Sequence, residues 1–288
     1  MARASEAFTP CLIIGRRALL SRVMVTPPAS SHPAEPAAPV FRLDAAAKTY
    51  GALTALKPLS VDLAAGQTTA FIGPSGSGKS TIVKLLAGLL APSTGRVLFH
   101  GQDVAALDPV AYRRRLGYVI QEGGLFPHMT GRQNVTLVAR EAGWSRAAIG
   151  ERLDTLARSV HMPADRLDRY PGELSGGQCQ RIGIMRALML DPEVLLFDEP
   201  FSALDPIIRY DLQSEVRDII DSFGKTAVLV THDLAEARFL SHHIHLMRAG
   251  RVVQSGSYDD LAAHPADGFV AKFFAAHRGL APEPGEPG

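Results

Sequence analysis

The sequence predicts an α/β fold in which helices cover a mainly parallel sheet and a helix-rich segment is inserted between two of its strands. Short apolar runs at 118–120, 194–197 and 227–230 are typical of strands buried on both faces. The segment GPSGSGKST, which begins at Gly73, follows an apolar run and precedes an amphipathic pattern, as in a strand–loop–helix unit. From about 131 to 190 the pattern is helical, without a convincing strand.

The elements before the insertion can be placed in order. Strands are expected at about 41–47, 58–63 and 68–72. The glycine-rich loop then leads into a helix whose apolar residues have the spacing of a core-facing stripe: Ile82, Leu85, Leu86, Leu89 and Leu90. Pro92 and Gly95 end this helix, and a strand is expected at 96–100.

Both ends of the chain are predicted to be disordered, at 1–40 and 281–288; residues 25–40 are rich in proline, alanine and serine, and the tail contains PEPGEP. The remainder, 41–280, is expected to be one domain with its helical part at about 121–190. The apolar run near Cys11 is short and is broken by Arg16 and Arg17, so we do not interpret it as a signal peptide. Met24 is an alternative start.

Composition narrows the class of protein. The 288 residues are 46% hydrophobic and 20% charged, as in ordinary globular proteins, and the net charge of +1 gives no reason to expect nucleic-acid binding. No apolar run approaches the length of about 18 residues that a membrane span needs. The two cysteines, Cys11 and Cys179, are not expected to pair, which fits a reducing compartment.

The loop from Gly73 to Ser80 matches the pattern G-x-x-x-x-G-K-[ST] in its required context. Gly73, Gly76 and Gly78 allow backbone N–H groups to surround a phosphate. Lys79 supplies a positive charge, and the Ser80 hydroxyl is suited to Mg²⁺. The alternative is a Gly- and Ser-rich turn that binds nothing.

Polar side chains are expected where other strands of the sheet end. VLLFDEP places Asp198 and Glu199 after a buried strand; Asp198 is suited to the Mg²⁺ shell, and Glu199 to polarising a water as general base. Gln121 and His232 also follow strands. Ligands gather at this edge of a parallel sheet, so these four side chains are candidates for one site. The alternative is an exposed Asp-Glu pair, with Gln121 and His232 as ordinary surface or core residues.

LSGGQCQR, from Leu174 to Arg181, predicts a second phosphate-binding surface. Ser175 is suited to cap a helix at about 176–190 with its hydroxyl free to turn outward, and Gly176 and Gly177 let backbone approach a ligand. The unpaired N–H groups of a helix N-terminus favour an anion.

Together, GPSGSGKS, Gln121, LSGGQ, VLLFDEP, SALD and the Thr231–Asp233 turn resemble the nucleotide-binding subunit of an ATP-binding cassette (ABC) transporter over about 41–255. This resemblance implies a P-loop NTPase with a RecA-like core, an antiparallel β subdomain and an inserted α-helical subdomain. It also implies a head-to-tail homodimer around two ATP molecules, with Asp205 at the dimer seam.

The resemblance also implies roles for individual residues. Tyr50 would stack on adenine, although a tyrosine at a strand end can instead pack locally. The catalytic residues would be Glu199 as base, His232 on the γ-phosphate and Gln121 as its sensor; Mg²⁺ would lie at Ser80, Gln121 and Asp198. The phosphates would be held by Gly73, Pro74, Ser75, Gly76, Ser77, Gly78, Lys79, Ser80 and Thr81, and across the dimer by Ser175, Gly176, Gly177 and Gln178.

The partners that the family implies are integral membrane permease subunits, which would dock around 121–140, and indirectly an extracytoplasmic substrate-binding protein. The chain would then lie peripherally on the cytoplasmic face of the plasma membrane. YVIQEGGLFPHMT and DEPFSALDPIIR are similar to ATPases that import osmoprotectants such as glycine betaine or choline. Many of those carry C-terminal CBS modules; the 288 residues contain none, which leaves ionic-strength gating by that route an open question.

The sequence leaves other functions open. The chain could energise uptake of another small solute, such as an amino acid, or act as a non-transport ABC ATPase on ribosomes or DNA. A regulatory module without turnover is a third alternative, against which Glu199 and His232 argue. His242, His243 and His245 are expected to be surface residues rather than metal ligands, and Cys179 is expected to pack rather than to react.

Overall fold

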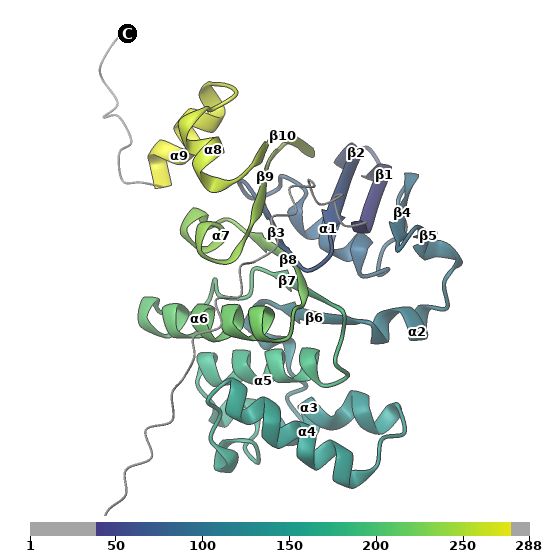
Figure 1. Ribbon diagram of the computed structural model, residues 1–288, viewed down its shortest axis with the longest axis vertical. Coiled ribbons are helices and arrows are strands. Elements are labelled where there is room, and N and C mark those ends of the chain that lie inside the picture. Colours follow the sequence, from purple (N-terminus) through teal and green to yellow (C-terminus); the bar gives the residue numbers. More distant parts are fainter. Residues whose placement is uncertain (1–38, 278–288) are drawn as a thin grey trace, which may run out of the picture. The chain divides into compact units, whose positions relative to one another are not determined.

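A computed structural model of the chain describes residues 39–277. The predictions for residues 1–38 and 278–288 lie outside this range; they include the disordered tail at 281–288, most of the disordered end at 1–40, the alternative start at Met24 and the state of Cys11. Disorder was wrongly predicted for Pro39 and Val40, because these two residues begin a strand. Within the described range, two sheets and the helices that cover them form one compact unit (Figure 1).

The smaller sheet is antiparallel and has the strand order β2-β1-β4-β5. Strands β1 (Pro39–Tyr50) and β2 (Leu53–Ala64) form a long hairpin, and β4 (Thr94–Phe99) pairs with the other edge of β1 before the short β5 (Gln102–Asp103). The predicted strands at 41–47, 58–63 and 96–100 are therefore confirmed, and β1 begins two residues earlier than expected. The antiparallel β subdomain that the resemblance implied is present.

The larger sheet has six strands in the order β10-β9-β3-β8-β7-β6. All neighbours are parallel from β9 to β6, and only β10 runs antiparallel. The predicted parallel strands correspond to β3 (Thr68–Ile72), β6 (Leu116–Ile120), β7 (Val194–Asp198) and β8 (Thr226–Thr231). The sequence pattern did not predict β9 (His243–Arg248) or β10 (Arg251–Gly256).

Alternate residues of the parallel strands enter two different cores, which explains why these strands are apolar throughout. In β7, Leu195 and Phe197 face one core, whereas Val194 and Leu196 face the other. The first core is covered by α5 (Gly176–Leu188), α6 (Pro206–Ser222) and α7 (Leu234–Leu240). The second is closed by α1 (Lys79–Leu86) and the antiparallel sheet.

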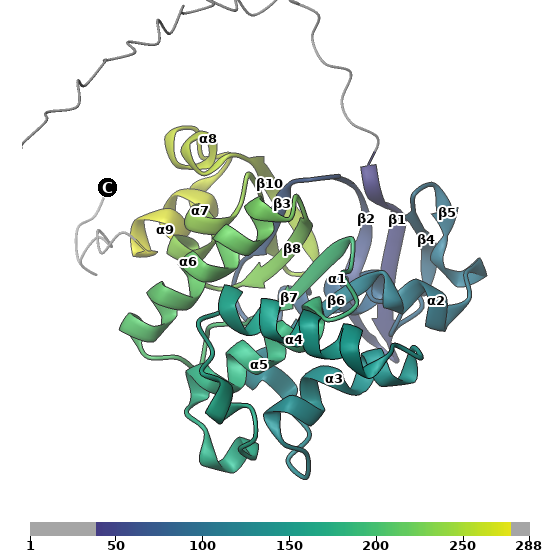
Figure 2. The same ribbon diagram turned by 60° about the horizontal axis from the view of Figure 1, so that its bottom comes forward.

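The helix-rich insertion is also confirmed, since residues 121–190 contain helices and turns but no strand. Its main helices are α3 (Gly131–Glu141), α4 (Arg146–Ser159) and α5, which contact one another and lie side by side in Figure 2. Three short 3₁₀ turns complete it, at Gln121–Gly124, Ala164–Arg166 and Pro171–Glu173. Side chains cap these helices: Thr130 and Gln133 form a capping box at α3, and Ser145 caps α4.

The remaining helices are α2 (Pro109–Arg114), α8 (Tyr258–Ala263) and α9 (Gly268–His277), with one further 3₁₀ turn at Val104–Ala106. Within residues 39–277, no helix combines the length and apolar character that crossing a membrane requires.

Candidate functional site

The register of the parallel strands brings the candidate residues to one edge of the sheet. Ile72 pairs with Thr231, Asp198 with Val230, and Ile120 with Asp198. The residues that follow these strands, Gly73, Gln121, Glu199 and His232, therefore emerge together where the strands end.

The glycines of the loop between β3 and α1 have different roles. Gly73 and Gly78 have φ values of 143° and 101°. A Cβ on Gly73 would collide with the Met247 carbonyl, and one on Gly78 would lie 2.6 Å from the carbonyl oxygen of Ala55. Gly76, with φ 75°, has open space around its Cα. The outer glycines thus let the loop pack closely on β2 and β9, and Gly76 leaves its outer side clear for a ligand.

Helix α1 has an N-terminus suited to a phosphate. Gly78 is its N-cap and no side chain caps it, so the first N–H groups, those of Lys79, Ser80 and Thr81, stay available. Lys79 as a whole is 5% exposed, and its ammonium donates to the carbonyl oxygens of Gly73 (2.8 Å) and Pro74 (3.2 Å). Burial lowers the pKa of Lys79, and the carboxylates of Glu199 and Asp198 act against this shift.

A second polar group beside the loop is built around Asp198, at the end of β7. The Ser80 hydroxyl donates to its Oδ1 at 2.8 Å, and the Tyr118 hydroxyl donates to its Oδ2 at 3.3 Å. Burial, together with Asp198, raises the pKa of Tyr118, so this hydroxyl stays protonated and able to donate. Carboxylate and hydroxyl oxygens are the ligands that Mg²⁺ prefers, so Ser80 and Asp198 fit that ion.

Glu199 and His232 form a pair next to this group. The Nδ1 atom of His232 lies 3.1 Å from Oε2 of Glu199. Glu199 has φ 50°, a left-handed conformation that is uncommon for residues other than glycine, and its N–H donates to the Val230 carbonyl at 2.9 Å. The change of backbone direction after Asp198 is what lets two adjacent carboxylates point to different partners.

Gln121 begins a turn that is fastened to helix α5. A Cβ on Gly183 of α5 would lie 2.9 Å from the Cα of Gly123 in the turn, so the two backbones touch. Arg186, also on α5, donates to the carbonyl oxygens of Gly123 (2.8 Å) and Gly124 (2.9 Å). Gln121 itself is exposed at the edge of the sheet.

Tyr50 lies at the end of β1 with 46% of its surface exposed, and the Lys48 ammonium is 5.4 Å from its ring centroid. The hairpin that carries it also supplies Ala55, whose carbonyl oxygen packs against Gly78 of the phosphate loop. The ring is therefore accessible on an element that contacts this loop.

The LSGGQ segment opens α5, which begins at Gly176 with Ser175 as its N-cap. The Ser175 hydroxyl accepts from the Gln178 N–H at 3.3 Å, and the Gln178 side chain accepts from the Ser175 N–H at 3.1 Å. The predicted cap is confirmed, but the Ser175 oxygen is engaged rather than free, which leaves its O–H proton to donate. A Cβ on Gly177 would lie 2.6 Å from Cγ2 of Ile208 on α6, so Gly177 is required by packing, whereas Gly176 is exposed.

Several polar side chains near the site were not recognised from the sequence: Tyr118, Arg209 and Glu236. Tyr118 could have been predicted, because it is a polar residue next to Val119 in an expected strand. That strand pairs with the strand that ends in Asp198. Arg209 and Glu236 carry no comparable signal, since their partners are distant in sequence.

The prediction that the three histidines lie on the surface is wrong for His245, which is 5% exposed. Strand β9 lies between β3 and β10 in the sheet, and the His245 side chain is flanked by Phe71 of β3 and by the Ser255 hydroxyl of β10, which lies 2.6 Å from its Nδ1. The His245 ring stacks on Phe71, and burial lowers its pKa to about 3. His243 lies on the same face, as expected, with ring centroids 4.8 Å apart. For Cys179, burial raises the pKa of the thiol, which fits the expected packing role.

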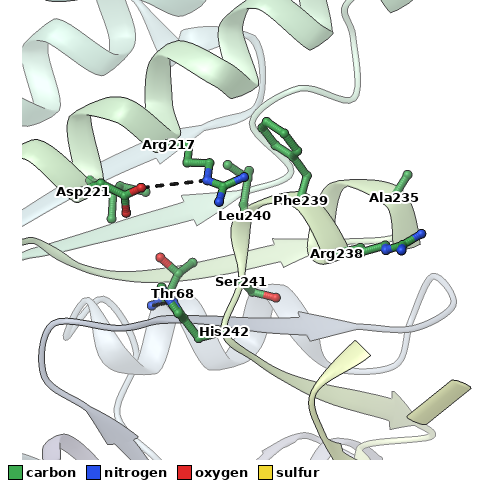
Figure 3. A pocket seen from close by; sticks show the side chains of 10 residues that line it. Thr68, Arg217, Asp221, Ala235, Arg238, Phe239, Leu240, Ser241 and His242 are labelled. Carbon is green, nitrogen blue, oxygen red and sulfur yellow. Dashed lines mark hydrogen bonds and ion pairs between the residues drawn. The ribbon is translucent and has the colours of Figure 1, made fainter. Parts of the chain in front are cut away.

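A cavity of about 380 Å³ lies at the other end of the same sheet (Figure 3). Thr68, at the start of β3, and His242, just before β9, line it together with Arg217 of α6 and Phe239 of α7. The phosphate loop follows the opposite end of β3, so this cavity is separate from the candidate site.

The fold and this edge of the sheet define a nucleotide-binding domain of the phosphate-loop class. Residues 56–202 match the profile of the family described as ABC transporter. The chain belongs to this family and contains its ATP-binding domain.

Three similar proteins have informative names. The chain is 45% identical over 240 residues to the glycine betaine/carnitine/choline transport ATP-binding protein of Bacillus subtilis, covering 83% of this chain and 63% of that protein. It is 44% identical over 227 residues to the glycine betaine uptake system ATP-binding protein of Escherichia coli, covering 79% and 74%. A solved ATP-binding cassette, in a dimeric post-hydrolysis state with ADP and Pi, aligns with a TM-score of 0.70 and 30% identity over 76% of this chain and 98% of that one. The chain thus spans less than two thirds of the Bacillus protein.

Proposed function

We propose that this chain is the ATP-hydrolysing subunit of an ABC importer. The observation that carries the proposal is the Glu199–His232 pair, 3.1 Å apart, at the sheet edge that also holds the phosphate loop and the Ser80–Asp198 contact. A carboxylate next to an imidazole, beside a phosphate-binding helix N-terminus, is an arrangement suited to activating a water against the terminal phosphate of ATP.

In this proposal, the phosphates of ATP bind to the loop from Gly73 to Thr81, and the Lys79 ammonium exchanges its loop carbonyl partners for phosphate oxygens. Tyr50 stacks on the adenine. Glu199 accepts a proton from the attacking water as the new O–P bond forms and ADP leaves. His232 donates to a γ-phosphate oxygen, and Gln121 senses that phosphate.

Ser80, Gln121 and Asp198 would hold Mg²⁺, which when bound neutralises charge on the phosphate oxygens. The Ser80 hydroxyl and Asp198 carboxylate already lie within 2.8 Å of each other, so their oxygens can serve one small ion.

Two copies of the chain would form a head-to-tail dimer. Each copy carries two surfaces suited to phosphate, the loop at α1 and the start of α5. In a dimer that sets Ser175–Gln178 of one copy against the phosphate loop of the other, both surfaces would bind the same ATP molecule. The similar solved cassette is dimeric. Asp205 would lie at the seam.

The cargo is inferred from the names of relatives, which are ATP-binding proteins of transport systems for glycine betaine, carnitine or choline, and the partners are those that the family implies. We infer an osmoprotectant as cargo, permease subunits docked near 121–140, an extracytoplasmic substrate-binding protein as an indirect partner, and a peripheral position on the cytoplasmic face of the membrane. Import of another small solute such as an amino acid is the alternative, and a non-transport ABC ATPase is a more distant one.

Two measurements test the proposal. Purified chain should release phosphate from ATP only when Mg²⁺ is present, and a deletion strain should lose uptake of radiolabelled glycine betaine or choline. Absence of ATP turnover, both alone and with membranes, would contradict the enzymatic part. Normal betaine and choline uptake with lost amino-acid uptake would favour the alternative cargo.

A further inference from the structure

The guanidinium of Arg209 joins two segments that are distant in sequence. Arg209 lies in the first turn of α6. Its Nη2 donates to the carbonyl oxygen of Leu204 at 3.0 Å, and its Nη1 donates to Oδ2 of Asp233 at 3.3 Å. Leu204 belongs to the SALD segment, and Asp233 directly follows His232. One side chain therefore holds the backbone of SALD to the turn that carries His232.

The bridge is only partly exposed to solvent. The paired side chains are 31% and 30% exposed, and within residues 39–277 the buried Nε of Arg209 has no hydrogen-bond partner. A buried donor without a partner costs free energy, which the two bonds made by the other nitrogens must offset. A planar guanidinium can serve two acceptors in different directions, whereas a lysine ammonium is a single point charge.

Asp233 is fixed on its other side as well. Its Oδ1 accepts from the N–H groups of Ala235 (2.8 Å) and Glu236 (3.3 Å), so it is the N-cap of α7. Its own N–H donates to the Thr231 hydroxyl at 3.0 Å. With both carboxylate oxygens and its N–H engaged, Asp233 transmits the position of Arg209 to the backbone on either side of His232.

A second contact between the same helices supports the bridge. Gln213, one turn further along α6, donates to Oε1 of Glu236 on α7 at 3.3 Å, and both residues are buried. Helices α6 and α7 are thus joined twice behind the His232 turn. The Arg209 contact is the one that also reaches SALD.

We propose that Arg209 is a positioning residue for ATP hydrolysis, which holds the SALD segment and the His232 turn in a fixed relation. The inference rests on the proposed function, in which SALD faces the second copy and His232 contacts the γ-phosphate. Arg209 would then ensure that closure against the second copy and alignment of His232 occur together.

The test compares Arg209→Ala and Arg209→Lys with Arg217→Ala. Arg217 lies two turns further along α6, where it pairs with Asp221 at 3.8 Å and its guanidinium lies 5.1 Å from the Phe239 ring centroid (Figure 3). Its replacement removes the same charge from the same helix without touching the bridge. Arg209→Ala should lower kcat about 10- to 100-fold, the usual effect of misplacing a catalytic group, with the Kd for ATP unchanged within about twofold. Arg209→Lys should be intermediate, and Arg217→Ala should stay within about twofold of the unmodified chain.

A second readout separates positioning from simple loss of stability. In Arg209→Ala, amide hydrogen exchange should increase together at 202–205 and 231–234, whereas Arg217→Ala should change neither segment. Asp233→Asn keeps the N-cap but weakens the bridge, so its effect on kcat should not add to that of Arg209→Ala.

The outcomes separate the two proposals. If the unmodified chain and Arg217→Ala both fail to hydrolyse ATP, the proposed function is wrong. If both hydrolyse ATP and the Arg209 variants retain full kcat, or if the effects of Arg209→Ala and Asp233→Asn are additive, the positioning role is wrong. Should Arg209→Ala not fold, Arg209→Lys and Asp233→Asn decide the question.

Discussion

Glu199 combines a strained backbone with a side chain that is 27% exposed at the candidate site, which points to a functional role for its conformation. Its φ of 50° costs on the order of 1–3 kcal/mol for a residue other than glycine. The surrounding contacts, from the Glu199 N–H to the Val230 carbonyl and from the Ser202 hydroxyl to the Glu199 carbonyl, hold it there. A structural glutamate at this place would gain nothing from such strain.

If Glu199 is the general base, Glu199→Gln should lower kcat by about 10²–10⁴, because the amide keeps the shape but cannot accept the proton. ATP binding should persist, since the phosphate loop is unchanged. Phosphate release and equilibrium ATP binding measure the two quantities. Equal turnover in the variant and the unmodified chain would remove Glu199 from this role.

The buried His245 makes the free energy of unfolding depend on pH in the acidic range. Burial lowers its pKa from 6.5 to about 3, so between these values the unfolded chain binds a proton that the folded chain does not. Stability is therefore lost as pH falls through this window, by about 2 kcal/mol at pH 5.

His245→Phe should remove this loss, because phenylalanine binds no proton in the unfolded chain. It can keep the stacking on Phe71, and the 2.6 Å contact of His245 with the Ser255 hydroxyl that it gives up is lost at every pH. Urea unfolding at pH 7.5 and 5 should show the variant gaining about 2 kcal/mol relative to the unmodified chain on acidification. His128→Phe, at an exposed position, is the control and should show no such gain. A pH-independent difference would contradict the assignment.

At the scale of elements, the turn after β6 and helix α5 are packed backbone to backbone through Gly123 and Gly183. Arg186 adds two hydrogen bonds from α5 to the same turn. Gln121 and the start of α5 therefore belong to neighbouring elements that cannot shift independently without breaking these contacts.

Gly183→Ala tests this coupling. Alanine raises helix propensity, but its Cβ would lie 2.9 Å from the Cα of Gly123, so the turn must move. We expect kcat to fall about tenfold or more, with helix content preserved by circular dichroism. Gly150→Ala on α4, where a Cβ meets nothing within 4 Å, is the control and should stabilise the chain by about 0.5–1 kcal/mol without affecting kcat. Unchanged turnover in Gly183→Ala would show that the turn tolerates the displacement.

The sequence predicted elements well where local pattern and burial agree. The runs in β3, β7 and β8 are apolar because both of their faces are covered, and the phosphate loop has a spacing that few other structures require. The sequence did not predict β9 and β10, where histidine and arginine interrupt the apolar pattern. It also placed His245 wrongly on the surface, because the burial of this residue depends on side chains of two neighbouring strands. The contacts of Arg209 and Glu236 could not be predicted from the sequence, because they join α6 to α7 across more than twenty residues.

At the scale of the whole molecule, the central question is whether one copy can complete a site. Glu199 and His232 lie beside the phosphate loop of the same chain. The start of α5 instead packs near Leu204 and Ile208 of the SALD–α6 region, through Gly176 and Gly177. Among the described residues, no hydrogen bond joins 175–178 to the loop at 73–81. A second copy would give the start of α5 a phosphate to face.

Mixed dimers test this arrangement directly. Lys79→Ala damages the phosphate loop of its own copy, and Ser175→Arg damages only the surface offered to the other copy. Each variant alone should be nearly inactive, although Ser175→Arg should still bind ATP. In a heterodimer both defects fall in one site and the other site is intact, so an equal mixture should regain about one quarter of normal turnover if sites act independently. Ser145→Arg is the control, because it removes an equivalent exposed N-cap, that of α4. It should keep full turnover, which would show that the Ser175→Arg defect does not come from the loss of a helix cap. Heterodimers isolated through two affinity tags that show no recovery, or a Ser175→Arg chain that is active alone, would contradict the shared site.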